Sequence, residues 1–160
     1  MKIILFDFDG VIADTFAFCY RIIHDRDGIS MEEYRARFEG NINDTTPQLS
    51  PSLPVKRVNF LEQYELALRE CSLNQEMISV IKELSQSYSL IIISSTVSSA
   101  IVTYLEAQGL KDSFKEVLGN DVEKSKIKKI QDVLQRYEID PSETVFITDT
   151  LGDIKEASVC

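Results

Sequence analysis

The stretch KIILFDFDG at residues 2–10 leads from a short apolar run directly into two carboxylates, Asp7 and Asp9. The apolar residues show no helical spacing, which predicts a strand covered on both faces. Side chains two residues apart on a strand share a face, and at the end of the strand one carboxylate can attack while the other, in the following turn, exchanges protons. The stretch therefore predicts the first strand of a buried sheet and two candidate catalytic groups at its end.

Beyond residue 74, helical and strand patterns alternate along the chain. Such alternation is typical of right-handed crossovers and a parallel sheet. The predicted fold class is α/β: a doubly wound parallel, Rossmann-like sheet with an inserted small helical cap. The further strands are expected at residues 90–93, 116–118 and 144–148. The helices between them are expected to end at residue 88, to cover residues 97–108 and 125–137, and to start again near residue 153.

Three helical patterns separate the first strand from this alternating part. The first begins near Thr15, and the second begins with a capping box, Ser30 as N-cap and Glu33 three residues later. The third covers residues 56–71. An irregular and mobile connection is expected before it, at residues 40–54, because this segment contains Gly, Asn, Asp, Ser, Thr and three prolines. We expect a catalytic core of residues 1–15 and 75–160 and a helical cap of residues 16–74.

In a parallel sheet of this kind, functional groups lie beyond the carboxyl ends of the strands. The polar residues at those ends, or at the head of the helix that precedes the last strand, are Asp7, Asp9, Ser94, Ser95, Lys124, Lys126, Asp149 and Asp153. Four carboxylates brought this close would repel one another, so a divalent cation is the natural neutraliser. Magnesium suits oxygen ligands and keeps positions open for water and phosphate. The sequence therefore predicts a Mg²⁺ site.

Three motifs of the chain resemble those of the haloacid dehalogenase-like superfamily of phosphatases. They are DFDGVIADT at residues 7–15, LIIIS at residues 90–94 and VFITDTLGD at residues 145–153. The resemblance spans nearly the whole chain, because a helical cap between the first motif and the next core helix is the family's first cap type. It implies that Asp7 is the nucleophile and Asp9 the acid/base, with its carbonyl on the metal. It further implies that Asp149 is a direct Mg²⁺ ligand and that Asp153 steadies metal-bound water.

The phosphate group of a substrate would be held by Ser94, Ser95 and a lysine at a helix start. The segment EKSKIKK at residues 123–129 offers several lysines, of which Lys126 has the better offset from Asp149, while Lys124 stays open. The chain departs from the family pattern at Thr148, where the family usually has Gly. It also stops at Cys160, where relatives usually continue into a further strand. We expect such a sheet to leave apolar surface uncovered.

Composition limits the partners of this 160-residue chain. Its 26 acidic and 17 basic residues give a formal charge of −9, which disfavours nucleic acid or an anionic membrane as the main partner. The three cysteines follow no metal-binding or disulfide spacing, and the first Asp comes too early for a signal peptide. A cytoplasmic protein is expected, as a monomer or a dimer.

The residues favour a phosphomonoesterase that acts on a small phosphorylated metabolite through an aspartyl-phosphate. A phosphomutase stays open, because it differs mainly in the acceptor that the phospho-enzyme meets. A non-catalytic or receiver-like phosphoacceptor domain is the third alternative. It is disfavoured because a receiver's acceptor Asp follows a middle strand of the chain, whereas the attacking pair here lies at the very start.

Overall fold

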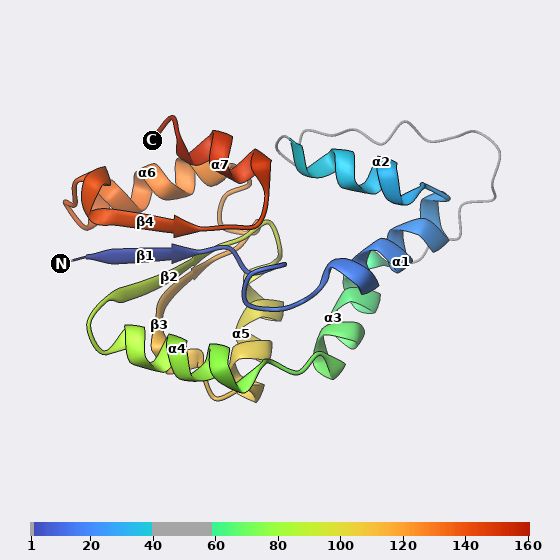
Figure 1. Ribbon diagram of the computed structural model, residues 1–160, viewed down its shortest axis with the longest axis horizontal. Helices are drawn as coiled ribbons and strands as arrows, with labels where there is room; N and C mark the ends of the chain where they lie inside the picture. Colours follow the sequence, from blue (N-terminus) through green and yellow to red (C-terminus); the bar gives the residue numbers. More distant parts are fainter. Residues whose placement is uncertain (1, 40–58) are drawn as a thin grey trace.

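The sheet of the computed structural model has four parallel strands in the order β3-β2-β1-β4. The structure describes residues 2–39 and 59–160. The strands are β1 (Ile3–Phe6), β2 (Ser89–Ile93), β3 (Phe114–Leu118) and β4 (Thr144–Ile147). Figure 1 shows them side by side, with all arrowheads pointing toward the same edge. The predicted fold class, a doubly wound parallel sheet, is confirmed.

Helices cover both faces of this sheet. Figure 1 shows α4 and α5 on one side and α6 and α7 on the other. Their bounds are α4 (Gln75–Ser85), α5 (Ser98–Ala107), α6 (Lys126–Arg136) and α7 (Leu151–Ala157), with short 3-10 turns η2 (Lys111–Ser113) and η3 (Pro141–Glu143). Alternate residues of β1 enter two separate cores: Ile4 and Phe6 pack in one, Ile3 and Leu5 in the other. Burial on both faces explains why the β1 sequence is continuously apolar.

The segment between β1 and α4 forms a group of helices beyond the carboxyl ends of the strands (Figure 1). We call this group the helical insert; its described elements are α1 (Phe16–Asp27), α2 (Met31–Ala36), η1 (Arg37–Glu39) and α3 (Phe60–Glu70). The predicted capping box is present, because Ser30 accepts from the Glu33 amide and the Glu33 side chain accepts from the Ser30 amide. The connection expected at residues 40–54 lies outside the described residues.

Some element boundaries differ from the sequence-based expectation. β1 ends at Phe6, because the Phe8 carbonyl accepts hydrogen bonds from the amides of Ile12 and Ala13 and so turns the chain at once. β3 starts at Phe114, two residues before the expected strand. The last helix starts at Leu151, since Thr150 caps it by accepting from the Asp153 amide.

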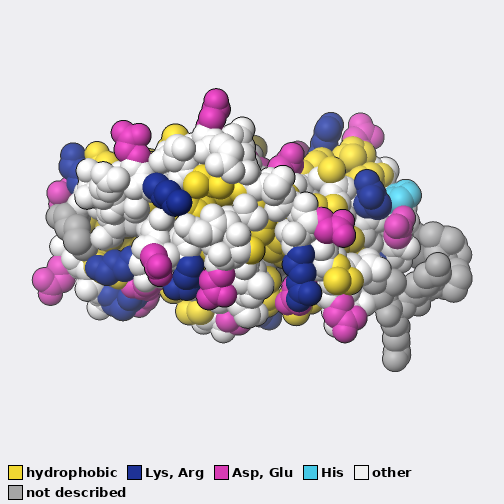
Figure 2. Space-filling view, turned by 90° about the horizontal axis from the view of Figure 1, so that it is seen from below, with side chains coloured by type: hydrophobic (Ala, Val, Ile, Leu, Met, Phe, Trp, Pro, Cys, Tyr) yellow, Lys and Arg dark blue, Asp and Glu magenta, His cyan; other side chains and the backbone are white. Residues whose placement is uncertain are grey.

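β4 is an edge of the described sheet, and it carries apolar side chains that face solvent. Val145 is 57% exposed and Ile147 is 38% exposed. Figure 2 shows acidic and basic side chains interspersed over one face of the molecule, with apolar side chains between them. Among the described helices, none combines the length and the apolar character that a membrane span requires.

Candidate active site

The turn after β1 fixes the first two candidate residues. Asp7 is 4% exposed, and its carboxylate accepts a hydrogen bond of 2.7 Å from the Phe8 amide. Its own amide donates to the Ile147 carbonyl at the end of β4, at 2.9 Å. Gly10 has a φ of +77°, which side chains with a Cβ rarely adopt. The sequence DFDG therefore forms a tight turn that holds Asp7 at the carboxyl edge of the sheet.

The carboxylate of Asp149 packs against the backbone of this turn. A Cβ on Gly10 would lie 2.1 Å from Oδ2 of Asp149, which no real contact allows. Gly10 is thus required both for its φ and for this close approach. The turn after β1 and the loop after β4 meet here, as expected for neighbouring parallel strands.

Lys126, the first residue of α6, reaches two of the carboxylates. Its Nζ donates to Asp7 at 2.8 Å and to Asp153 at 2.5 Å, and the side chain is nearly buried. Burial by itself would lower the pKa of this lysine, but the charges of Asp7 and Asp153 outweigh it and raise the pKa. Lys126 is therefore a fixed positive charge beside the candidate nucleophile.

The carboxylates of the site have shifted pKa values. Burial raises the pKa of Asp7 well above its ordinary range, and the charge of Asp153 adds to this while Lys126 opposes it. Burial also raises the pKa of Asp149, helped by the charges of Asp153 and Asp9. For Asp153, burial is outweighed by Lys126 and by hydrogen bonds from its neighbours, so its pKa is lowered. Burial is thus the main reason why the pKa values of Asp7 and Asp149 are raised, whereas the contacts of Asp153 outweigh its burial.

Thr148, the departure from the family pattern, has a defined contact. Its hydroxyl donates to Oδ2 of Asp153 at 2.7 Å. The same carboxylate oxygen accepts from Lys126. The threonine thus helps to hold Asp153 in place, a role that a glycine has no side chain to fill.

Asp9 lies between the sheet and the helical insert. Oδ1 of Asp9 accepts from the Tyr64 hydroxyl of α3, and Oδ2 accepts from the Thr96 hydroxyl after β2, both at 2.7 Å. The sequence reasoning did not identify these two partners. Tyr64 has the helical spacing of an apolar core residue, between Leu61 and Leu68, and Thr96 lies two residues beyond the serine of the LIIIS motif. The only feature of the sequence that pointed to Thr96 is that it belongs to a run of three hydroxyl residues, SST, after a predicted strand.

The serines after β2 occupy different positions. Ser95 and Thr96 line the cavity described below, whereas Ser94 is fully buried and is not among the residues that line it. The Ser94 hydroxyl accepts from the Thr96 amide at 3.0 Å and so shapes the loop. The expected contact of Ser94 and Ser95 with phosphate stays a prediction.

A cavity of about 470 Å³ lies between the strand ends and the helical insert. On the sheet side it is lined by Asp7, Asp9, Lys126, Asp149 and Asp153, which the structure thus brings together as the sequence predicted. On the insert side the walls are mainly aromatic and apolar, with two cationic side chains among them: Phe16, Cys19, Ile23, Arg26, Tyr34, Arg37, Phe38, Phe60 and Tyr64. The cavity has the size and polarity of a small-molecule site.

Nearly the whole chain matches one known family. A sequence model described as haloacid dehalogenase-like hydrolase matches residues 4–159. The chain belongs to this family. Among curated proteins no relative was detected.

Solved structures of this family share the fold. A mutant of CbbY from Rhodobacter sphaeroides, in complex with xylulose-(1,5)bisphosphate, superposes with a TM-score of 0.75 at 18% identity, covering 99% of this chain and 82% of that chain. A predicted phosphoglycolate phosphatase from Haemophilus somnus gives 0.69 at 17% identity, over 99% of this chain and 81% of that chain. A putative β-phosphoglucomutase from Thermotoga maritima gives 0.68 at 19% identity, again over 99% and 81%.

The donor set of this haloacid dehalogenase-like chain fits a magnesium ion. Within residues 2–39 and 59–160, no three His, Cys, Asp or Glu side chains are grouped as metal ligands. Magnesium, however, usually binds through one or two carboxylates, with waters and substrate phosphate completing its shell. Asp7 and Asp149, which line the same cavity, match that type of site. A cation bound in this cavity would neutralise both carboxylates.

Proposed function

We propose that the chain is a magnesium-dependent phosphomonoesterase that acts on a small phosphorylated metabolite through an aspartyl-phosphate on Asp7. The observation that carries the proposal is the pair of hydrogen bonds from Lys126 to Asp7 and Asp153 at the carboxyl edge of the sheet. A lysine in this position neutralises both the attacking carboxylate and an incoming phosphate dianion. Membership of a hydrolase family supports the reaction class.

The reaction would proceed in two displacements at phosphorus. In the first, a carboxylate oxygen of Asp7 attacks, the bond from phosphorus to the ester oxygen breaks, and Asp9 gives its proton to the leaving alcohol. In the second, Asp9 takes a proton from water, the water oxygen attacks phosphorus, and Asp7 is released with inorganic phosphate. Acid–base assistance of this type contributes roughly 10²- to 10⁴-fold in rate.

Other residues of the site bind and orient. Ser94, Ser95 and the backbone amides of their loop would donate to the phosphate oxygens, and Lys126 would contribute charge. Mg²⁺, held by Asp7, Asp149 and the Asp9 carbonyl with Asp153 in support, would offset the repulsion between carboxylate and phosphate when bound. The helical insert, as a cap over the cavity, would admit a small molecule and exclude bulk water. The charge and the cysteine usage of the chain support a cytoplasmic protein. We expect it to be a monomer or a dimer.

The test is Mg²⁺-dependent release of phosphate from p-nitrophenyl phosphate and from a panel of phosphorylated metabolites. We expect Asp7→Asn to abolish turnover and chelation of the metal to do the same. Asp14→Asn, a neighbouring exposed aspartate, is the matched control and should keep full activity. Asp149→Asn should weaken Mg²⁺ binding, whereas Asp9→Asn should keep it. Equal metal affinity in the last two variants would contradict the assigned roles.

The same experiment separates the alternatives. A phosphomutase would pass the phosphoryl group to a sugar hydroxyl, so a phosphorylated sugar would be isomerised faster than phosphate is released. A receiver-like domain would be phosphorylated once and would not turn over. Turnover with stoichiometric release of phosphate distinguishes the phosphatase from both.

A further inference from the structure

Tyr64 links the helical insert to the candidate acid/base. It lies 55 residues from Asp9 along the chain, on α3, yet its hydroxyl is 2.7 Å from the Asp9 carboxylate. The side chain is 2% exposed, and its ring packs on Phe18 and Phe60 with centroid distances of 5.7 and 5.8 Å. Burial, together with the charge of Asp9, raises the pKa of Tyr64, so the hydroxyl keeps its proton and is the donor. The ring fixes the hydroxyl, and the hydroxyl contacts the carboxylate.

Thr96 contacts the same carboxylate through its other oxygen. It lies in the loop after β2, 87 residues from Asp9, and donates to that second oxygen at 2.7 Å. One donor therefore belongs to the insert and the other to the sheet. A carboxylate held at both oxygens cannot rotate about its terminal bond without losing a hydrogen bond.

We propose that Tyr64 is a positioning residue for the acid–base steps: it sets, with Thr96, the orientation in which Asp9 gives and takes its proton. The proposal rests on the proposed function and adds a component from the insert to it. The orientation of Asp9 thus depends on a contact from α3, in the helical insert, as well as on the loop after β2.

The hydrogen-bonding capacity of the Asp9 carboxylate is compatible with this role of Tyr64. Each carboxylate oxygen has two lone pairs, so one contact per oxygen leaves room for a proton shared with the leaving alcohol or with water. Hydroxyl groups rotate freely, so that both contacts can persist when Asp9 changes its protonation state. Tyr64 itself does not exchange a proton with substrate in this scheme.

A purely structural role for Tyr64 predicts something different. The aromatic ring would then account for the whole contribution, and Tyr64→Phe, which keeps the ring, would change little. If the substitution loosened the insert in general, all substrates would be affected alike. Positioning of a proton donor instead affects a substrate in proportion to its need for that proton.

The experiment compares two substrates of nearly equal size, phenyl phosphate and p-nitrophenyl phosphate. Phenolate is the more basic leaving group and depends on protonation, whereas p-nitrophenolate leaves readily without it. The ratio kcat/KM reports the steps up to departure of the leaving group. We expect Tyr64→Phe to lower kcat/KM for phenyl phosphate about tenfold, the effect of one lost hydrogen bond to a charged group, and that for p-nitrophenyl phosphate less than about twofold.

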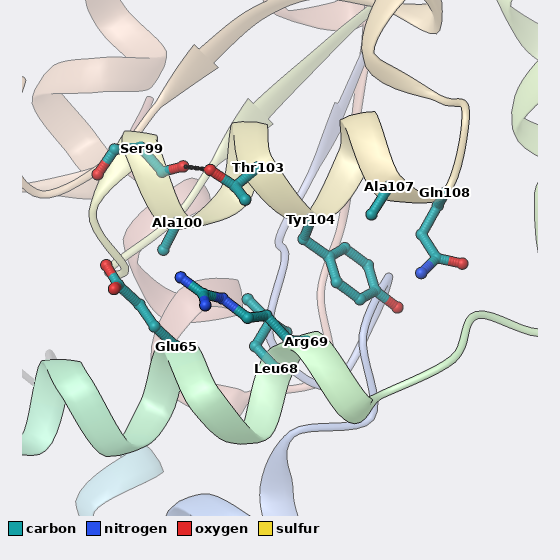
Figure 3. Close-up of a pocket in the computed structure, with 9 residues that line it drawn as sticks. All are labelled: Glu65, Leu68, Arg69, Ser99, Ala100, Thr103, Tyr104, Ala107 and Gln108. Carbon is teal, nitrogen blue, oxygen red and sulfur yellow. Dashed lines mark hydrogen bonds between the residues drawn. The ribbon is translucent and has the colours of Figure 1, made fainter.

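Two further variants make the test specific. Thr96→Val removes the other donor and should produce the same selective loss. Tyr104→Phe is the matched control: Tyr104 is a buried tyrosine on α5 whose hydroxyl has no hydrogen-bond partner among the described residues. Figure 3 shows it beside a second pocket, between α5 and the α3 residues Leu68 and Arg69. Its substitution should leave both kcat/KM values unchanged.

The outcomes test the positioning role of Tyr64 and the proposed phosphatase function separately. If the wild-type chain is active and Tyr64→Phe affects both substrates equally or neither, the role of Tyr64 is wrong while the proposed function stands. If the wild-type chain hydrolyses no phosphomonoester, the proposed function fails and the positioning role with it. Selective loss in Tyr64→Phe and Thr96→Val, with an unchanged Tyr104→Phe, supports the role. Thermal unfolding of each variant verifies that it is folded.

Discussion

Two lysines one turn apart at the start of α6 are both buried, yet their surroundings differ. Lys126 is 5% exposed and donates to two carboxylates, those of Asp7 and Asp153. Lys129 is 2% exposed and donates to two backbone carbonyls, Ser94 at 2.6 Å and Gly119 at 3.3 Å. The first lies at the site, and the second lies under the loops that follow β2 and β3.

The difference shows that the hydrogen-bond partners of a buried lysine, and not its burial alone, decide the direction in which its pKa shifts. Full negative charges raise the pKa of Lys126 in spite of burial. Carbonyl dipoles do not offset burial at Lys129, and the nearby charge of Lys126 opposes a second cation, so its pKa is lowered to about 8. We therefore propose that Lys126 takes part in the reaction, whereas Lys129 stabilises the loops after β2 and β3.

Substitution of Lys126 should have the largest effect. Lys126→Met leaves Asp7 and Asp153 without their cation and removes the charge that attracts phosphate. We expect kcat/KM for p-nitrophenyl phosphate to fall roughly 10³-fold, comparable to loss of one strong electrostatic contact in a transition state. Lys124→Met, at the lysine that the sequence left open as the alternative to Lys126, should cost no more than about threefold. A larger loss in Lys124→Met than in Lys126→Met would reverse the assignment.

Substitution of Lys129 should affect stability instead. Lys129→Met removes the side-chain donor of the Ser94 carbonyl, whereas the Gly119 carbonyl keeps the amides of Val122 and Glu123 as donors. The substitution also removes a buried charge. We expect the free energy of unfolding to fall by about 1–2 kcal/mol, measured by urea denaturation. The folded variant should keep most of its activity. Unchanged stability would mean that the loops do not depend on this lysine.

The free energy of unfolding should depend on pH through the lowered pKa of Lys129. Between its folded pKa of about 8 and its ordinary value of 10.5, the unfolded chain binds more protons than the folded one at this residue. Stability from this group therefore rises with pH across that window. The wild type should gain about 1 kcal/mol relative to Lys129→Met between pH 7.5 and pH 10, by denaturation at each pH, after allowance for solvent screening. A difference that stays flat or falls with pH would be inconsistent with a lowered pKa.

The smallest effect is expected at a partly exposed ion pair between the end of α6 and β3. Arg136 is 42% exposed and makes a bidentate contact with Glu116 at 2.8 and 2.9 Å. This hydrogen bonding to Arg136, against the opposing effect of burial, lowers the pKa of Glu116. The contribution of the pair is thus present above the ordinary value of 4.5 and is lost as pH falls through the lowered pKa. Glu116→Gln should cost only about 0.5 kcal/mol at pH 7, and a cost above that of Lys129→Met would weaken the comparison.

The sheet and its polar edge could be predicted from the sequence because both depend on short local patterns. A continuously apolar run, followed at once by Asp7, indicates a buried strand with a functional end. The pattern of strands and helices after residue 74 then brings Asp149 and Lys126 to the same edge. The register is not contained in these local patterns: the pairing of β2 with β3 shifts between Leu90 and Ile91.

Other parts of the site could not be predicted because they depend on packing between distant segments. Tyr64 has the spacing of a core residue, and only the position of α3 over the cavity brings its hydroxyl to Asp9. Thr148 looked like the loss of a glycine, but it contacts Asp153 across the loop. The sequence favoured Lys126 over Lys124 only by its offset from Asp149, and the orientation of α6 is what brings Lys126 to Asp7.

Trapping of the phospho-enzyme tests most directly whether Asp7 accepts a phosphoryl group. The protein is mixed with Mg²⁺ and a phosphomonoester that it hydrolyses. The reaction is quenched in acid within milliseconds, and the protein is digested for mass spectrometry. We expect a phosphate adduct on the peptide that contains Asp7, and no such adduct in Asp7→Asn. An adduct on another residue, or turnover at full rate in Asp7→Asn, would contradict the proposed role of Asp7.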